Sequence, residues 1–246
     1  MKEREIYAGL RTVAPFFVRV DGRNFRQALA LLNCKQPHDS AFANSMAAAS
    51  EILMRRSGLP VQLVFAFSDE ANALFLETPF DGRVEKLDSV VASFFASSVT
   101  LKLSPKDPLT FDARVIPMSR WDVPRYLEWR QNEAWRKHVH AHTYYFLRRN
   151  GKSAREAHAQ LLRMSADQMH ELAFSHDVNL AKTPSWQRRG ILVHKEVFEK
   201  KSIDKEGRQI SAQRSRIIQN WDLPLFKSPE GRDTLRRLAG LDTDKY

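Results

Sequence analysis

The first half of the chain alternates between short apolar runs and longer stretches with apolar residues at helical spacing. The runs at 15–21, 61–67, 71–77 and 111–118 are rich in β-branched and aromatic residues, which predicts four strands. Residues 39–57 and 83–103 have the spacing of helices, and Asp39 is a suitable N-cap for the first of them. The predicted order is β-α-β-β-α-β, the ferredoxin-like pattern of an α+β fold.

Almost all of the chain after residue 120 has a helical pattern. We expect helices at 122–149, 153–163, 165–175 and 228–240, and a hairpin that begins with a short strand at 191–198 and turns near Gly207. The change of pattern divides the chain into a ferredoxin-like domain over residues 1–119 and a mostly helical region over residues 120–246.

Two aspartates come together if this topology is correct. Asp21 ends the first predicted strand, and Asp69 lies in the turn between the second and third strands, next to Glu70. The crossover rule makes the first two strands parallel, so both aspartates are expected at the same edge of the sheet. The alternative is that both are ordinary turn residues.

Converging carboxylates repel each other unless they hold a cation, and a site built only from oxygen ligands favours Mg²⁺. The carbonyl of Gly22 offers a further ligand. A pair of Mg²⁺ ions would support in-line phosphoryl transfer. Arg19 and Arg23 flank this strand end and suit a nucleotide triphosphate, although for each arginine alone a surface salt bridge is the more frequent case.

Charge changes the picture in the second half of the chain. The net charge of the 246 residues is +10, yet residues 1–119 hold 14 basic and 13 acidic residues, whereas residues 120–220 hold 20 and 11. Basic and aromatic residues are interleaved there, which suits a nucleic-acid partner with a phosphate backbone and exposed bases. A solvated helical surface with aromatic core residues is the alternative.

Other classes of protein are disfavoured. No apolar run is long enough to cross a membrane, the charged N-terminal residues lack an apolar signal core, and Cys34 is the single cysteine, so we expect a cytoplasmic protein. The sequence contains no glycine-rich phosphate loop. His138, His140 and His142 alternate, and because residues two apart do not share a helix face, we do not expect all three to bind one metal ion.

Several short motifs occur in order over residues 6–195. They are RVDGRNF at 19–25, PHDS at 37–40, FSDE at 67–70, FFASS at 94–98, FDARV at 111–115, YLEWRQ at 126–131 and RRG at 188–190. Together they resemble the tRNA-His guanylyltransferase family, whose members add nucleotides to the 5′ end of tRNA in the 3′–5′ direction.

The resemblance implies a polymerase-like palm domain followed by a family-specific, mostly helical region. It implies two Mg²⁺ ions held by Asp21, Gly22 and Asp69, with Glu70 as a third catalytic residue. The expected nucleotide-binding residues are Arg19, Gly22, Arg23, Asn24, Phe25, Lys35, Asp39, Ser68, Arg83 and Lys86. The expected tRNA-binding residues are Arg130, Arg136, Lys137, Arg188 and Arg189.

The chain also departs from the family. Gln36 stands where the family has a lysine before its Pro-Asn-Asp motif, with Lys35 one position earlier. The stretch WRKH at 135–138 replaces the His-Ile-Asn-Asn motif of eukaryotic members, and of the family's Lys-Asn-Glu only Glu171 is kept. These differences favour the Thg1-like branch of archaea and bacteria, which copies a template.

The sequence therefore predicts a Mg²⁺-dependent nucleotidyltransferase. By resemblance, ATP or GTP activates the 5′-monophosphate of tRNA, and the 3′-hydroxyl of an incoming nucleotide then attacks it, in tRNA 5′-end repair or guanosine addition to tRNA-His. The expected partners are tRNA, ATP, GTP and further copies of the chain in a dimer or tetramer. The alternatives are a tRNA-His-specific guanylyltransferase, a palm-type nucleotide cyclase and a non-catalytic RNA-binding protein.

Overall fold

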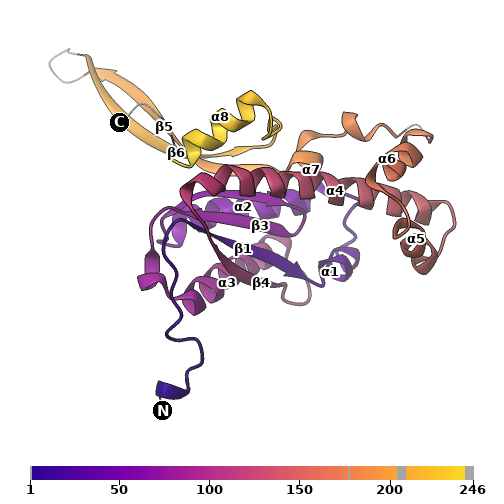
Figure 1. Ribbon diagram of the computed structural model, residues 1–246, viewed down its shortest axis with the longest axis horizontal. Coiled ribbons are helices and arrows are strands. Elements are labelled where there is room, and N and C mark those ends of the chain that lie inside the picture. Colours follow the sequence, from indigo (N-terminus) through magenta and orange to yellow (C-terminus); the bar gives the residue numbers. More distant parts are fainter. Residues whose placement is uncertain (1, 177, 204–208, 242–246) are drawn as a thin grey trace.

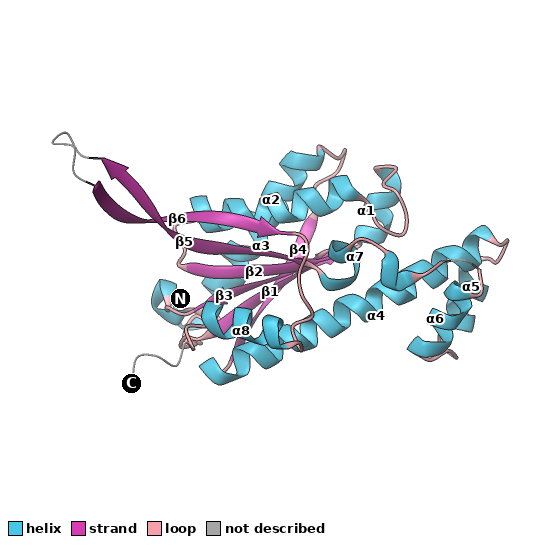
Figure 2. Ribbon diagram, turned by 90° about the horizontal axis from the view of Figure 1, so that it is seen from above, coloured by secondary structure: helices cyan, strands magenta, loops and turns pink. Residues whose placement is uncertain are grey.

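The computed structural model describes residues 2–176, 178–203 and 209–241. Its centre is a six-stranded sheet in the order β4-β1-β3-β2-β5-β6, and every neighbouring pair of strands is antiparallel (Figures 1 and 2). The strands are β1 (Phe16–Arg23), β2 (Val61–Phe67), β3 (Glu70–Phe75), β4 (Thr110–Pro117), β5 (Ile191–Ile203) and β6 (Gln209–Asn220).

The first four strands, with α2 (Ser40–Arg56) and α3 (Val84–Leu103), form the predicted β-α-β-β-α-β unit, in which β1 lies between β3 and β4. Asp39 caps α2 as expected, because its Oδ1 accepts a hydrogen bond of 2.9 Å from the backbone N–H of Phe42. The short helix α1 (Phe25–Leu31) was not predicted. It starts directly after β1, and its N-cap, Asn24, makes no side-chain capping bond.

The sheet continues beyond residue 120. The hairpin expected near residue 191 exists, but it is longer than predicted, and β5 pairs with β2 and thereby adds two strands to the palm sheet. The far part of the hairpin projects beyond the other strands (Figure 2). Gly207, expected in its turn, lies outside the described residues.

Helices cover both faces of the sheet. On one face, Phe16, Val18 and Val20 of β1 are buried with residues of α2 and α3. On the other face, Phe17 is buried with residues of α4 (Val123–Arg149) and α8 (Pro229–Leu238). The regions before and after residue 120 therefore share one hydrophobic core, and the two expected domains are packed against each other.

The helix α4 has 27 residues and runs past the end of the sheet, where α5 (Ala154–Leu161) and α6 (Ala166–Phe174) pack against it (Figure 1). The short helix α7 (Ser185–Arg189) follows them and precedes β5. Among the described helices, none combines the length and apolarity that a membrane crossing requires.

The packing of α4 on the sheet can be tested at Leu127, whose side chain is completely buried. We expect Leu127→Ala to lower the free energy of unfolding by about 2–5 kcal/mol, because it removes buried methyl groups and leaves a cavity. Urea denaturation followed by circular dichroism measures the change. Leu162→Ala, at an exposed leucine, is the control and should shift stability by no more than about 0.5 kcal/mol. Equal effects of the two variants would contradict this packing.

Candidate active site

The structure brings Asp21 and Asp69 together at one end of the central strands, which is called the carboxylate edge below. The backbone N–H of Gly22 donates a hydrogen bond of 3.0 Å to the carbonyl oxygen of Asp69, which lies in the tight turn between β2 and β3. A Cβ atom on Gly22 would lie 2.8 Å from the Cβ of Asp69 and 2.4 Å from the Phe25 ring. The close approach of the two segments therefore requires glycine at this position.

Further carboxylates lie beside Asp21. In the sheet register Asp21 is opposite Glu70 on β3 and opposite Asp112 on β4. Side chains of directly opposed residues in antiparallel strands project to the same face, so these carboxyl groups gather on the face covered by α4. Burial raises the pKa of Asp21, and the charges of Asp69, Glu70 and Asp112 act in the same direction.

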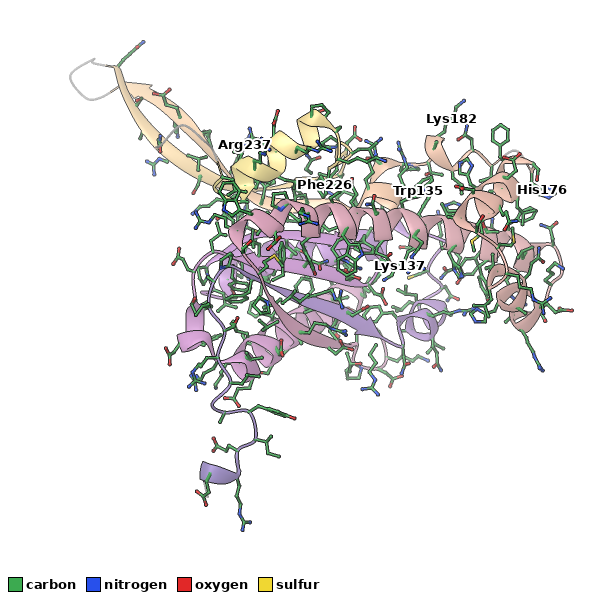
Figure 3. All side chains as sticks on the ribbon, in the orientation of Figure 1. Trp135, Lys137, His176, Lys182, Phe226 and Arg237 are labelled. Atoms are coloured by element: carbon green, nitrogen blue, oxygen red, sulfur yellow. The ribbon has the colours of Figure 1, made fainter. Side chains whose placement is uncertain are left out.

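A lysine that is distant in the sequence partly balances these acids. Lys137 lies on the side of α4 that faces the sheet (Figure 3), and its Nζ is 3.6 Å from Oε2 of Glu70. Its charge lowers the pKa of Asp21. With Ser68, Asp69 and His140, Lys137 also lines a cavity of about 320 Å³. Lys137 therefore lies beside the carboxylates of Asp21, Asp69 and Glu70, although we expected it on the tRNA-binding surface.

The position of Glu70 differs from the expectation of a catalytic group. Its side chain is 2% exposed, and its two oxygens accept hydrogen bonds of 2.9 and 2.8 Å from Nε and Nη2 of Arg130. The amide of Asn72 donates a third bond, 3.0 Å long. This pairing engages both carboxylate oxygens and also buries Arg130, which we expected to bind tRNA. The two residues instead anchor α4 to β3.

The polar contacts between α4 and the sheet continue along the strands. The hydroxyl of Tyr126 donates a hydrogen bond of 2.6 Å to Oδ1 of Asn72, and burial raises the pKa of Tyr126 to about 12. Arg19 approaches this tyrosine from β1, and its Nε is buried without a partner among the described residues. Arg19 therefore lies under α4, two positions before Asp21 on the same face of the strand.

Some of the expected nucleotide-binding residues line one cavity. Lys35 and Ser68 lie there together with His38 and Trp186. Asp39 also borders the cavity, but its carboxylate is occupied by the helix cap and by a 2.8 Å hydrogen bond from the backbone N–H of Lys35. Its role in this structure is to hold the loop before α2 in place.

Other expected nucleotide-binding residues lie elsewhere. Phe25 is a core residue, with its ring 4.8 Å from that of Phe111, so its ring is not available to stack on a base. Arg23 and Asn24 border a separate surface cavity beside α1.

Arg83 and Lys86 are at the start of α3, near the beginning of β1. Five residues of strand, about 17 Å, separate that end of β1 from Asp21. Within one chain, Arg83 and Lys86 are therefore at the wrong end of the sheet for a nucleotide held by Asp21.

Of the remaining basic residues, Arg188 and Arg189 belong to α7, and Arg136 lies on α4 next to Lys137. Arg188 and Arg189 line a cavity of about 250 Å³ with Trp135 and Lys227. The guanidinium of Arg189 also donates a hydrogen bond of 2.7 Å to the carbonyl of Leu223. Arg136 is exposed and paired with Glu133. These positions leave tRNA binding by Arg136, Arg188 and Arg189 as a prediction.

Sequence reasoning missed one cluster beside this site. His138 and His142 of α4 meet His38 from the loop before α2. The expectation that His138, His140 and His142 do not form a common site agrees with the structure, because His140 lines the cavity of Lys137 instead. The four-residue spacing of His138 and His142 was a visible signal, but the third partner lies 100 positions away from His138.

An antiparallel sheet built on a β-α-β-β-α-β unit, with two aspartates at the edge next to the β2–β3 turn, defines a palm-type domain. The family model of tRNAHis guanylyltransferase matches residues 1–119, and the model of the Thg1 C-terminal domain matches residues 122–222. The chain therefore belongs to the tRNAHis guanylyltransferase (Thg1) family.

Several curated proteins are similar to this chain. Arabidopsis thaliana tRNA(His) guanylyltransferase 1 is 27% identical over 82% of the chain, and a probable tRNA(His) guanylyltransferase of Mus musculus is 26% identical over 84%. The aligned region is 37% of the plant protein and 76% of the mouse protein. The chain thus spans little more than a third of the length of its plant relative.

Solved structures share the fold. A bacterial Thg1-like protein in complex with GTP superposes with a TM-score of 0.72 at 21% identity, covering 97% of this chain and 96% of the other. The tRNA(His) guanylyltransferase of Saccharomyces cerevisiae superposes with a TM-score of 0.66 at 23% identity, covering 78% and 90%. These similarities confirm the predicted palm-type fold.

The buried ion pair beneath the site gives a second prediction. We expect Arg130→Met to lower the free energy of unfolding by about 3–5 kcal/mol, because Glu70 is left as a buried charge without its main partner. The double variant Arg130→Met/Glu70→Leu should recover most of this loss. Urea denaturation of both variants measures the two effects.

The control is Arg136→Met, which removes an ion pair whose arginine is 64% exposed on the same helix. Exposed pairs contribute about 0–1 kcal/mol, so this variant should remain close to the wild type. If the single variant Arg130→Met were as stable as this control, the pair would not anchor α4.

Proposed function

We propose that the protein is a nucleotidyltransferase that extends the 5′ end of tRNA in the 3′–5′ direction. The observation that carries the proposal is the meeting of Asp21 and Asp69 across the Gly22–Asp69 hydrogen bond. Family membership supports the same chemistry. The GTP and ATP complexes of the bacterial Thg1-like proteins support nucleotide binding by this fold.

The donor set at this edge fits Mg²⁺. Asp21, Asp69 and the carbonyl of Gly22 offer only oxygen ligands. Burial first, and the neighbouring carboxylates after it, raise the pKa of Asp21, and a bound divalent cation would stabilise its charged form. Two Mg²⁺ ions bound there would supply charge neutralisation at the phosphate and a more acidic attacking hydroxyl. We assign these three residues as the metal ligands.

Other side chains near the carboxylates have roles in charge balance and nucleotide binding. Lys137 places a cation beside the carboxylates, where it offsets their repulsion before substrate binds. The cavity lined by Lys35 and Ser68 lies next to Asp69, so we assign it to the activating nucleotide. Water-exposed Ser68 also donates a hydrogen bond of 3.1 Å to Oδ1 of Asp69, which orients that carboxylate.

For tRNA we propose the basic surface of the second half of the chain. Arg188 and Arg189 line a cavity with Trp135, a combination that suits a phosphate next to a stacked base. Arg136 lies on the same helix as Trp135 but borders the cavity of Lys137, nearer the carboxylates. By family membership we also propose a homo-oligomer. In it, Arg83 and Lys86 of one copy would lie close to the nucleotide site of another copy.

The metal ligands give the third prediction. We expect Asp21→Asn and Asp69→Asn each to lower the rate of nucleotide addition at least about 100-fold, because each removes a charge that holds the cation during phosphoryl transfer. Binding of tRNA should persist. The assay uses labelled ATP and a tRNA that lacks its first nucleotide, and it separates 5′-adenylylated RNA from a cyclic nucleotide or from binding alone.

The matched control is Asp81→Asn. Asp81 lies in the short 3-10 helix Pro79–Gly82 before α3, at the far end of the strands from Asp21, and its side chain is 91% exposed. This variant should turn over like the wild type. If Asp21→Asn or Asp69→Asn had near-normal turnover in saturating Mg²⁺, the substituted residue would not be a metal ligand.

The fourth prediction concerns the source of specificity. Because the stretch at 135–138 differs from the eukaryotic motif, we propose that base pairing with the opposite strand selects the nucleotide, while the protein grips the backbone. A tRNA without its first 5′ nucleotide should be extended by the Watson–Crick partner of the unpaired base. Four template bases combined with two anticodons test this. Guanosine addition that ignores the template and requires the histidine anticodon would favour a tRNA-His-specific enzyme.

A further inference from the structure

Three histidines from separate parts of the chain meet beside the candidate nucleotide cavity. His138 and His142 are four residues apart on α4, so they share one face of the helix. His38 comes from the loop before α2 and reaches the same face. One ring nitrogen of each histidine lies within 4.8 Å of the ring nitrogens of the other two. The three nitrogens are therefore near enough for small rotations of the rings to place them around a single ion.

Hydrogen bonds fix which nitrogen of His138 faces the cluster with a lone pair. The hydroxyl of Thr183 donates its proton to the carbonyl of Leu180 at 2.7 Å, so the same oxygen accepts from Nε2–H of His138 at 3.0 Å. Nδ1 of His138 therefore carries the lone pair and accepts a hydrogen bond of 3.0 Å from Nε2–H of His38, whose proton a bound cation would displace. Metal-binding histidines commonly donate their other ring N–H to such an outer acceptor.

The third histidine, His142, has a buried ring nitrogen, Nε2, without a hydrogen-bond partner among the described residues. Buried polar atoms without a partner are uncommon in folded proteins, and a bound ion would satisfy this one. The side chain of Gln187 also acts on this ring by a hydrogen bond that raises the pKa of His142, against the larger lowering by burial. The rings of His138 and His142 are in contact, with centroids 4.5 Å apart.

The cluster has the protonation state that metal binding needs. Burial lowers the pKa of His38 to about 4 and that of His138 to about 2, and it also lowers the pKa of His142. All three rings are therefore neutral at pH 7, and a bound cation would displace the Nε2 proton that His38 donates to His138. Neutral imidazoles without a carboxylate favour Zn²⁺, Cu²⁺ or Ni²⁺ over Mg²⁺.

We propose that His38, His138 and His142 form a binding site for a divalent transition-metal ion, for which Zn²⁺ is the expected occupant. The site is separate from the carboxylate edge of Asp21 and Asp69. Three histidine ligands leave one coordination position for water or another small ligand. Because His38 also lines the cavity with Ser68 and Trp186, the ion ties α4 to the loop that forms one wall of this cavity.

This proposal does not rest on the nucleotidyl transfer, and its test needs no activity measurement. The metal-stripped full chain is titrated with Zn²⁺ by calorimetry and with Co²⁺ by absorption spectroscopy. We expect one ion per chain, a Co²⁺ spectrum typical of four-coordinate geometry, and a higher Tm in the presence of Zn²⁺. X-ray absorption of the Zn²⁺-loaded protein should show histidine nitrogens as ligands.

Two variants remove one ligand each, His38→Asn and His142→Gln. We expect each to lower the affinity for Zn²⁺ at least about 100-fold, which exceeds the usual effect of losing an outer partner. Thr183→Val removes only the acceptor for His138 and should weaken binding about 10–100-fold. His158→Gln, at an exposed histidine of α5, is the matched control and should bind like the wild type.

The outcomes separate clearly. Stoichiometric binding that is lost in the two ligand variants and kept in the control supports the site. Binding that is equal in wild type, His38→Asn and His142→Gln, or wild-type protein that takes up no ion with histidine ligands, would overturn it. If a variant fails to fold, as seen by circular dichroism, the ligand identity from X-ray absorption of the wild type decides the question.

Discussion

The buried pair of Arg130 and Glu70 is the contact on which the arrangement of this protein depends. It joins α4, which has 27 residues, to β3, the strand that follows the turn of Asp69. Two charges removed from water are tolerable only with several well-placed hydrogen bonds, and here Asn72 supplies one of them. Because α4 is fixed in this way, Lys137 lies beside the carboxylates and His138 and His142 lie beside the loop before α2. Both polar sites thus depend on one anchored helix.

Much of the palm was predictable from the sequence because its signals are local. Alternating and continuous apolar runs marked β1 to β4, and the aspartate at position 39 marked the start of α2. The convergence of Asp21 and Asp69 needed one further step, the parallel direction of β1 and β2 that the crossover rule implies. The structure agrees with that step, since β1 and β2 are each antiparallel to β3 and hence parallel to each other.

The contacts between the two halves were not predictable in the same way. Arg130 and Lys137 have the pattern of exposed basic helix residues, and only the placement of α4 on the sheet shows that one is buried and the other borders the acids. The three-histidine cluster was missed for the same reason, since His38 is remote from its partners. Arg83 and Lys86 were expected to bind the nucleotide because they match basic residues of the family. Such a match does not show at which end of the strands the residues lie within a single chain.

The hydrogen bond from Gly22 to Asp69 has a consequence for how the region around the two aspartates unfolds. The amide of Gly22 lies in a central strand, between β3 and β4, and its acceptor belongs to the turn that joins two other central strands. Asp21 belongs to β1, which pairs with both β3 and β4, and Asp69 lies in the two-residue turn between β2 and β3. The strands on either side therefore limit how far the two aspartates can move apart. Hydrogen exchange at the amide of Gly22 should therefore follow the opening of the strands around it and not that of an exposed loop.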